Sequence, residues 1–239
     1  MNRTRPVIAI DGPAGVGKST TARVLAQRLG YVLVDTGALY RGVALAAWDR
    51  GISWDDEEGI VALSDEVRLS FQPEADGTPR LSIDGVDRGD EIRRPEISAG
   101  ASRVSAYPGV RRALLGIQRS LGRDGGVVLE GRDIGTVVFP DAEVKLFLTA
   151  SAEERARRRV QDLQDRGMTA DQNQILSQIR SRDKADSTRP IAPLRPAEDA
   201  VILDSTSLDL DAVVEHVLEL VRACDSSTPT DRSSDPSVG

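Results

Sequence analysis

Apolar runs divide the first fifty residues into short strands and longer helices. The run 7–10 contains no polar residue, which is typical of a strand buried on both faces. A helical spacing of apolar residues begins at about Lys18 and stops at Gly30. A second apolar run at 32–34 precedes another helical pattern from about 38 to 50. This alternation of strand and helix predicts a parallel sheet with right-handed crossovers.

The pattern then changes to period two. Residues 67–72 and 81–84 alternate apolar and polar positions, and glycines punctuate them. Such alternation favours short antiparallel strands with one wet face, so we expect a small antiparallel sheet inserted at about 63–100. A helical stretch at 108–121 returns the chain to the larger frame.

Buried-strand patterns resume in the second half of the chain, at 127–129, 144–148 and 201–203. Between the last two lies a polar, arginine-rich helical region at about 151–185. Ser151 and Glu154 have the spacing of a capping box that would begin it. We expect an α/β fold with a three-layer αβα core around a five-stranded parallel sheet.

The C-terminal part ends in a helix and a polar tail. Residues 210–222 place six apolar side chains on one stripe, which indicates packing on the core. Residues 224–239 are mostly Ser, Thr, Asp and Pro, and we expect them to be disordered. The folded domain is therefore expected to span 1–223.

Composition excludes several classes of protein. The net charge is −7, from 38 acidic and 31 basic residues, which argues against general nucleic-acid binding. One cysteine excludes an internal disulfide, and one histidine excludes a multi-His metal site. No apolar run is long enough to span a membrane and the N-terminus lacks a signal-peptide core, so a cytoplasmic protein is expected.

The basic residues are unusually biased toward arginine, because only Lys18, Lys145 and Lys184 are lysines. A GC-rich genome would produce this bias. Recognition of phosphates would also do so, because a guanidinium binds phosphate through two parallel hydrogen bonds. Composition alone leaves both explanations open.

One segment matches the phosphate-loop motif G-x-x-x-x-G-K-[ST] without deviation, and it lies between a predicted strand and a predicted helix. Glycines let the backbone wrap around phosphates, and the helix presents its positive end to the same anion. Lys18 would reach the β- and γ-phosphates, and Ser19 would ligate Mg²⁺. The predicted ATP-binding residues are Gly12, Pro13, Ala14, Gly15, Val16, Gly17, Lys18, Ser19 and Thr20.

A phosphate loop predicts that a nucleotide binds, but it does not identify the reaction. GTPases need an Asn-Lys-x-Asp motif, and neither asparagine of this chain is followed by lysine. AAA-type and motor ATPases need an apolar strand that ends in an acidic pair, and no predicted strand ends that way. A small kinase with a second site for the phosphoryl acceptor remains.

Two segments could form that second site, because each follows a predicted strand at its carboxyl end. In 35–41, Thr36 would cap the next helix and bind an acceptor phosphate, with Arg41 nearby. An ordinary helix start with an exposed arginine is the alternative. In 130–141, the pair Arg132-Asp133 suits a phosphate clamp beside a carboxylate, and a salt-bridged loop is the alternative.

Taken together and in this order, these segments resemble the bacterial cytidylate kinases, which are nucleoside monophosphate kinases. The resemblance runs from Val7 to about Arg222. Its matching segments are 10–19, 35–41, 130–141, Arg182-Asp183, 186–189 and 192–194. The resemblance implies that the insertion at 63–100 binds the monophosphate, and that 151–185 forms a lid over ATP.

The resemblance also implies roles for single residues. The acceptor phosphate would be held by Thr36, Arg41, Arg132 and Arg189; the cytosine by Ser102, Arg111 and Asp133; the ribose by Arg182 and Asp186. Thr36 stands where many members have serine, which keeps the hydroxyl. Ser19-Thr20 differs from the Gly-Thr of some members and restores a hydroxyl that can ligate Mg²⁺.

Four arginines lie close together in the expected lid, at 155 and 157–159. A solvated helix face or a nucleic-acid patch is the alternative, and the acidic net charge argues against the patch. By resemblance they close over the transferring phosphoryl group, and Arg158 is the first candidate.

The sequence therefore predicts a monomeric, Mg²⁺-dependent enzyme that converts ATP and CMP or dCMP to ADP and CDP or dCDP. Lys18, Arg132 and Arg158 are its predicted catalytic residues. No nucleic-acid or membrane partner is expected. A kinase of another small acceptor such as shikimate, a kinase that prefers UMP or AMP, and a non-catalytic nucleotide-binding regulator remain as alternatives.

Overall fold

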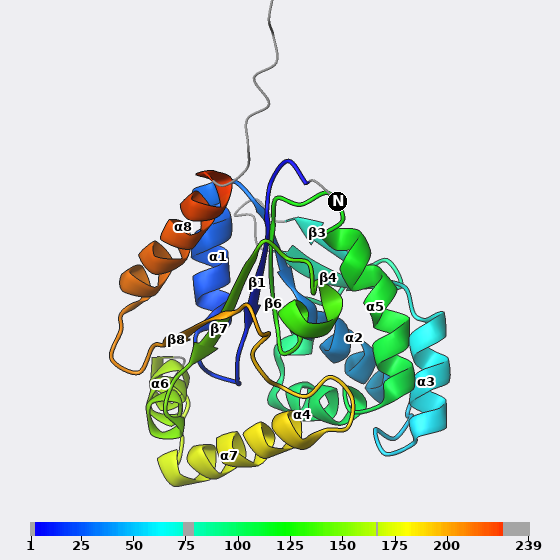
Figure 1. The fold of residues 1–239 in the computed structure, drawn as a ribbon. Coiled ribbons are helices and arrows are strands. Elements are labelled where there is room, and N and C mark those ends of the chain that lie inside the picture. Colours follow the sequence, from blue (N-terminus) through cyan, green and yellow to red (C-terminus); the bar gives the residue numbers. More distant parts are fainter. Residues whose placement is uncertain (1–2, 74–78, 166, 227–239) are drawn as a thin grey trace, which may run out of the picture.

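A five-stranded parallel sheet lies at the centre of the computed structural model, which describes residues 3–73, 79–165 and 167–226 (Figure 1). Its strand order is β2-β6-β1-β7-β8, so β1 lies in the middle with β6 and β7 beside it. All four strand pairs are parallel, as predicted. The strands are β1 (Val7–Asp11), β2 (Val32–Asp35), β6 (Val127–Gly131), β7 (Val144–Thr149) and β8 (Val201–Asp204).

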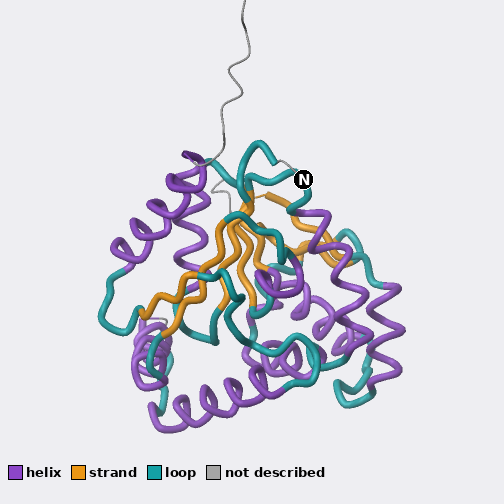
Figure 2. The backbone as a smooth tube through the Cα atoms, in the orientation of Figure 1, coloured by secondary structure: helices purple, strands orange, loops and turns teal. Residues whose placement is uncertain are grey.

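Helices cover both faces of this sheet and confirm the predicted three layers (Figures 1 and 2). On one face, α1 (Lys18–Leu29) and α8 (Leu210–Ser226) pack against alternate residues of the strands, such as Ile8 and Ile10. On the other face, Val7 and Ala9 pack with the turn η2 (Ile134–Val138) and the partly buried apolar residues of α5 (Pro108–Leu121). Helix α2 (Thr36–Asp49) lies beside β6 on that side.

The predicted antiparallel sheet is present between α3 (Glu57–Glu66) and η1 (Glu91–Arg93), and it has three strands. It packs on α2 at Gly42, where a Cβ atom would lie 2.6 Å from Cδ2 of Leu81. Helix α3 and helix α4 (Pro95–Val104) were not predicted, and α4 packs against α2. The strands are β3 (Leu69–Pro73), β4 (Pro79–Ile83) and β5 (Val86–Asp87).

The arginine-rich region forms two helices, α6 (Ala152–Asp165) and α7 (Gln172–Thr188). They pack together through a small apolar cluster of Ala156, Ile175 and Ile179, which is separate from the core around the sheet. This gives the expected lid region a core of its own. Its movement as a lid stays a prediction.

Helix α8 buries five of the six residues of the predicted stripe, including Val213, Val217 and Val221, whereas Leu210 at its start is exposed. It continues to Ser226, so the expectation of disorder from residue 224 is wrong for 224–226. Residues 210–228 contain no proline that would end the helix earlier. Residues 227–239 of that prediction lie outside the described residues. None of the helices within the described ranges is long and apolar enough for a membrane span.

Candidate functional site

The loop between β1 and α1 has a backbone that favours glycine at three positions. Gly12, Gly15 and Gly17 have φ angles of +150°, +75° and +101°. A Cβ atom on Gly12 would lie 2.2 Å from the carbonyl oxygen of Leu148 in β7. Gly17 has no side chain with which to cap α1, so the first N–H groups of that helix remain directed at the loop. This backbone fits a phosphate group.

Lys18 begins α1 and folds back over the loop, where its Nζ donates a hydrogen bond of 2.7 Å to the carbonyl oxygen of Pro13. Burial, followed by the positive charge of Arg132, lowers the pKa of Lys18 to about 7. Arg182 acts in the same direction. Positive charges from three different elements therefore converge at the loop. An anion bound there would stabilise these charges.

Ser19 and Thr20 follow Lys18 and are exposed at the start of α1. Ser19 forms a side-chain hydrogen bond with Glu130, at the carboxyl end of β6. Burial raises the pKa of Glu130, the charge of Asp35 adds to this effect, and Lys18 opposes it. A hydroxyl beside a carboxylate is a donor set that Mg²⁺ accepts once phosphate oxygens are also present.

The start of α2 differs from the prediction in one respect. Asp35, and not Thr36, is the N-cap, because its Oδ1 accepts a 3.1 Å hydrogen bond from the backbone N–H of Ala38. Thr36 is already helical, and its hydroxyl donates to the carbonyl oxygen of Glu130 at 2.7 Å. Asp35 also pairs with Arg41, which brings that guanidinium back to the carboxyl end of β2.

The segment after β6 contributes a second pair of charged residues. Arg132 donates from Nε to Oδ2 of Asp186 in α7 at 3.0 Å. Asp133 is buried and forms an ion pair with Arg111 of α5, and Nη2 of Arg189 lies 3.7 Å from its Oδ1. The structure thus brings five of the predicted substrate-binding residues together from three separate segments.

Arg111 is held from two further sides. Its guanidinium lies over the ring of Tyr40, 5.4 Å from the centroid. Its Nη1 donates to the carbonyl oxygen of Ser105 at 3.1 Å, and Ser105 Oγ donates to the carbonyl oxygen of Ser102. Ser102 is half-buried on α4, one turn before Ser105, and these contacts link it to Arg111 through Ser105.

Several buried cationic groups of this region keep unused donors. Among the described residues, Nε of Arg41, Nε of Arg182 and Nη2 of Arg189 are buried without a hydrogen-bond partner. Burial lowers the pKa of Arg182 to about 10, and Arg132 lowers it in the same direction. Native proteins rarely leave such donors unpaired, so these atoms are available to an anion that binds here.

Sequence reasoning assigned no role to Asp11, which ends β1. Its two carboxylate oxygens accept hydrogen bonds of 2.8 Å each from the backbone N–H groups of Ile134 and Gly135. Burial raises the pKa of Asp11 to about 6. Asp11 thereby fixes the turn that carries Arg132 and Asp133. The sequence feature that could have identified Asp11 is an acidic residue at the end of an otherwise fully apolar strand.

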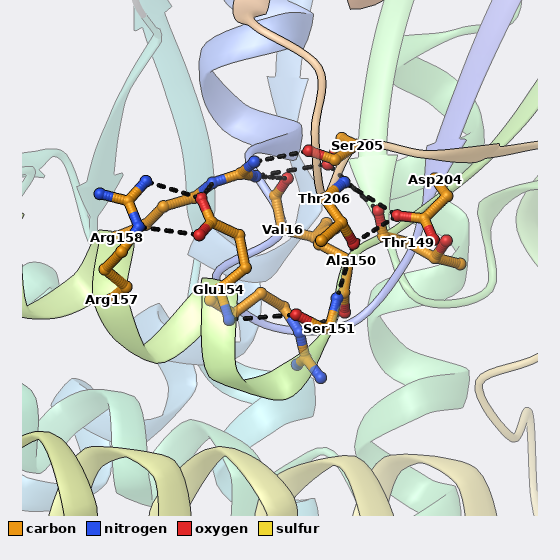
Figure 3. Close-up of polar contacts among 11 residues, drawn as sticks. Val16, Thr149, Ala150, Ser151, Glu154, Arg157, Arg158, Asp204, Ser205 and Thr206 are labelled. Atoms are coloured by element: carbon orange, nitrogen blue, oxygen red, sulfur yellow. Dashed lines mark hydrogen bonds and ion pairs between the residues drawn. The ribbon is translucent and has the colours of Figure 1, made fainter.

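The arginines of α6 separate in the structure. Arg158 donates to Oε1 of Glu154 at 2.8 Å and to the carbonyl oxygen of Ser205 at 2.6 Å, and its Nη1 lies 3.4 Å from the carbonyl oxygen of Val16 (Figure 3). Arg157 is exposed and pairs with Glu154. The catalytic role of Arg158 stays a prediction, because it would require Arg158 to release protein partners.

The predicted capping box of α6 is half formed. Ser151 Oγ accepts a 3.2 Å hydrogen bond from the backbone N–H of Glu154. The side chain of Glu154 turns to the arginines, and the N–H of Ser151 donates to Thr206 Oγ1 (Figure 3). The start of α6 is therefore tied to the segment after β8.

Comparison with known proteins agrees with this geometry. The family model described as cytidylate kinase matches residues 8–223. A cytidylate kinase from Syntrophotalea carbinolica is 53% identical over 95% of this chain and 97% of its own length. Those from Pelotomaculum thermopropionicum and Pseudomonas aeruginosa are 49% and 50% identical, each over 91% of this chain and 96% of its own length. The chain belongs to the cytidylate kinase family.

Proposed function

We propose that this protein transfers the γ-phosphoryl group of ATP to CMP, and also to dCMP, giving ADP and CDP or dCDP. The observation that carries the proposal is the convergence of the phosphate loop, Lys18 and buried guanidinium groups with unused donors. Two phosphate-bearing substrates would supply the negative charge that this cluster favours. Membership of the cytidylate kinase family selects the acceptor.

The donor would bind along the loop between β1 and α1. Backbone N–H groups of Gly15 and Gly17 and the start of α1 would contact its phosphates, and Lys18 would leave Pro13 to reach the β- and γ-phosphates. Ser19 would hold Mg²⁺, which neutralises charge on the phosphates. The described residues contain no cluster of three or more metal-ligating side chains, so the nucleotide would supply the remaining ligands.

The acceptor would lie between β6, α2 and α7. We assign its phosphate to Thr36, Arg41, Arg132 and Arg189, and its ribose to Arg182 and Asp186. The unused donors of Arg41, Arg182 and Arg189 support this placement. All of these residues come from one chain, so a monomer would suffice.

The base would be selected by Asp133, with Ser102 and Arg111. The carboxylate of Asp133, paired with Arg111, offers only acceptor oxygens. Cytosine presents an N4 amine that can donate to Asp133. Uracil would place an oxygen there, acceptor against acceptor, at a cost of about 1–3 kcal/mol.

The chemistry would need no nucleophilic side chain and no strong base, because the acceptor is already an ionised phosphate. The protein would hold the two phosphates in line and stabilise the charge that spreads over the transferring group. Lys18 and Arg132 are the residues that we assign to this stabilisation, with Arg158 as a further candidate. Exclusion of water by the lid region would suppress hydrolysis of ATP.

A coupled assay of ADP formation with CMP, dCMP, UMP and AMP tests the proposal. We expect the highest kcat/KM with CMP or dCMP. A preference for UMP or AMP would show that the assignment of Asp133, Ser102 and Arg111 is wrong. ADP formation with none of the four acceptors would overturn the proposed activity itself.

A further inference from the structure

Arg155 of α6 is the most buried member of the arginine cluster, with a side chain only 5% exposed. Its Nε donates to the carbonyl oxygen of Ala150 at 3.0 Å, and its Nη1 donates to the carbonyl oxygen of Ala14 at 3.1 Å. Nη1 and Nη2 also bind the two carboxylate oxygens of Asp183 at 3.0 and 2.7 Å. These contacts use four of the five N–H groups that a guanidinium has.

Arg155 is therefore not free to contact a phosphate, although it lies in the expected lid. Its partners belong to three segments: the phosphate loop, the end of β7 and helix α7. Asp183 binds both ends of the guanidinium fork, and this bidentate contact fixes the orientation of Arg155. The second N–H of Nη1 then donates to the carbonyl oxygen of Ala14 in the phosphate loop.

The contact with Ala14 has a consequence for the next residue. A peptide unit is planar and trans, so its C=O and N–H groups point in opposite directions. Because Arg155 binds the carbonyl oxygen of Ala14, the N–H of Gly15 points away from that guanidinium. Gly15 has a φ of +75°, and a glycine at this place leaves the peptide free to rotate unless something holds it.

We propose that Arg155 is a positioning residue that fixes the Ala14–Gly15 peptide with its N–H directed at the donor phosphates, and that Asp183 in turn orients Arg155. The inference rests on the proposed binding of ATP at the loop. It assigns Arg155 and Asp183 to the preorganisation of the phosphate site and not to contact with the transferring group. Preorganised backbone donors bind charge without reorganising.

Binding of inorganic tripolyphosphate, ATP and CMP to Asp183→Asn and Arg155→Lys tests this inference. Tripolyphosphate has no base or ribose, so it reports on the loop alone. We expect about a ten- to hundredfold weaker Kd for tripolyphosphate and ATP in both variants, which is the range for losing a charged hydrogen bond. The Kd of CMP should change less than these, because the CMP phosphate residues on α2 and after β6 are untouched; only Asp183→Asn alters the charge beside Arg182 on α7, so Arg155→Lys is the sharper arm and should stay within about threefold of wild type.

A matched control exists on the same two helices. Glu153 and Arg180 also join α6 to α7, at 2.6 Å, but both are exposed and neither contacts the loop. Glu153→Gln should leave all three affinities unchanged. If Arg155 only attached α7 to α6, tripolyphosphate binding would survive in Arg155→Lys, or CMP binding would fall as much as ATP binding.

The Gly15 amide resonance gives an independent measurement in the folded variants. In wild type we expect it to shift strongly when tripolyphosphate is added, and in Asp183→Asn to shift little at equal phosphate concentration. Normal tripolyphosphate affinity and a normal Gly15 shift in both variants would overturn the inference. Failure of wild type to bind ATP would instead refute the proposed function, so the two failures are distinguishable.

Discussion

At the scale of single residues, Lys18 shows how burial and neighbouring cations at the phosphate loop act on the pKa of one group. Its ammonium is buried, and Arg132 and Arg182 both disfavour its charge, so its pKa is lowered to about 7. A bound triphosphate would replace these repulsions with attraction and raise the pKa of Lys18 again. Nucleotide binding above pH 7 should therefore be coupled to proton uptake.

Calorimetry at pH 8.5, in buffers of different ionisation enthalpy, tests this coupling. Above pH 7.5 ATP itself is essentially fully ionised, so the proton must come to the protein. We expect uptake of close to one proton, and ATP affinity that falls as pH rises from 7.5 to 9. Lys18→Arg keeps the charge but does not titrate in this range, so its affinity should be nearly independent of pH. Equal proton uptake in both proteins would contradict the prediction.

Arg132 is the residue for which function and stability should separate most clearly. Its removal breaks the contact with Asp186 but also relieves repulsion with Lys18 and Arg182, so the two effects on stability oppose each other. For Arg132→Ala we expect kcat/KM to fall by about a hundredfold or more, with the free energy of unfolding changed by less than about 2 kcal/mol.

Denaturant unfolding and steady-state kinetics on the same preparation measure both effects. Arg103→Ala is the control, because Arg103 forms only an exposed ion pair with Asp55 and lies away from the phosphate residues. Arg103→Ala should change neither kcat/KM nor the free energy of unfolding. Loss of cooperative unfolding in Arg132→Ala with normal residual turnover would show that Arg132 is a structural residue.

At the scale of elements, the sequence predicts best what depends on neighbouring residues. The five sheet strands, α1, α5 and the phosphate loop follow from local patterns, and all are present. Helix α4 escapes prediction although its buried residues Ile97, Gly100, Ala101 and Val104 have helical spacing, because the helix has only ten residues and two of the four are small. The Arg155–Asp183 contact escapes because it joins two helices whose packing no local pattern encodes.

The strand-to-helix turn at Gly12 is the element most sensitive to a single methyl group. A Cβ atom there would meet the backbone of β7 at 2.2 Å, and the φ of +150° is strained for any other residue. We expect Gly12→Ala to lose more than about 2 kcal/mol of stability and to lose ATP binding.

Gly116 provides the opposite case. It lies within α5, and a Cβ atom there would meet nothing within 4 Å. Gly116→Ala should therefore stabilise the protein by about 0.5–1 kcal/mol, because alanine loses less backbone entropy in a helix. Chemical denaturation measures the free energy of unfolding of both variants. A Gly12→Ala protein as stable as wild type would contradict the prediction, because it would show that the backbone of β7 moves away from the added methyl group at little cost.

At the scale of the whole molecule, the net charge and the site have opposite signs. The chain carries −7, yet Lys18, Arg41, Arg132 and Arg182 converge at the ends of β1, β2 and β6. The acidic total therefore describes the surface, and part of the arginine excess belongs to the site. Arg41 and Arg132 have carboxylate partners, but the neighbouring cations still disfavour the charges of Lys18 and Arg182, and a phosphate ligand would reverse that effect.

This opposition predicts that the ligand-free protein becomes more stable when one of these charges is removed. Arg182 is the best choice, because burial disfavours its charge and its buried Nε has no hydrogen-bond partner. We expect Arg182→Met to raise the Tm of the ligand-free protein by a few degrees, since about 1 kcal/mol shifts the Tm of a domain of this size by about 2–4 °C. The same variant should lose most of the thermal shift that saturating CMP gives wild type, because the cation that CMP would neutralise is absent. A lower ligand-free Tm with an undiminished CMP shift would mean that Arg182 supports the fold through Asp183 and Asp186 and takes no part in binding the acceptor.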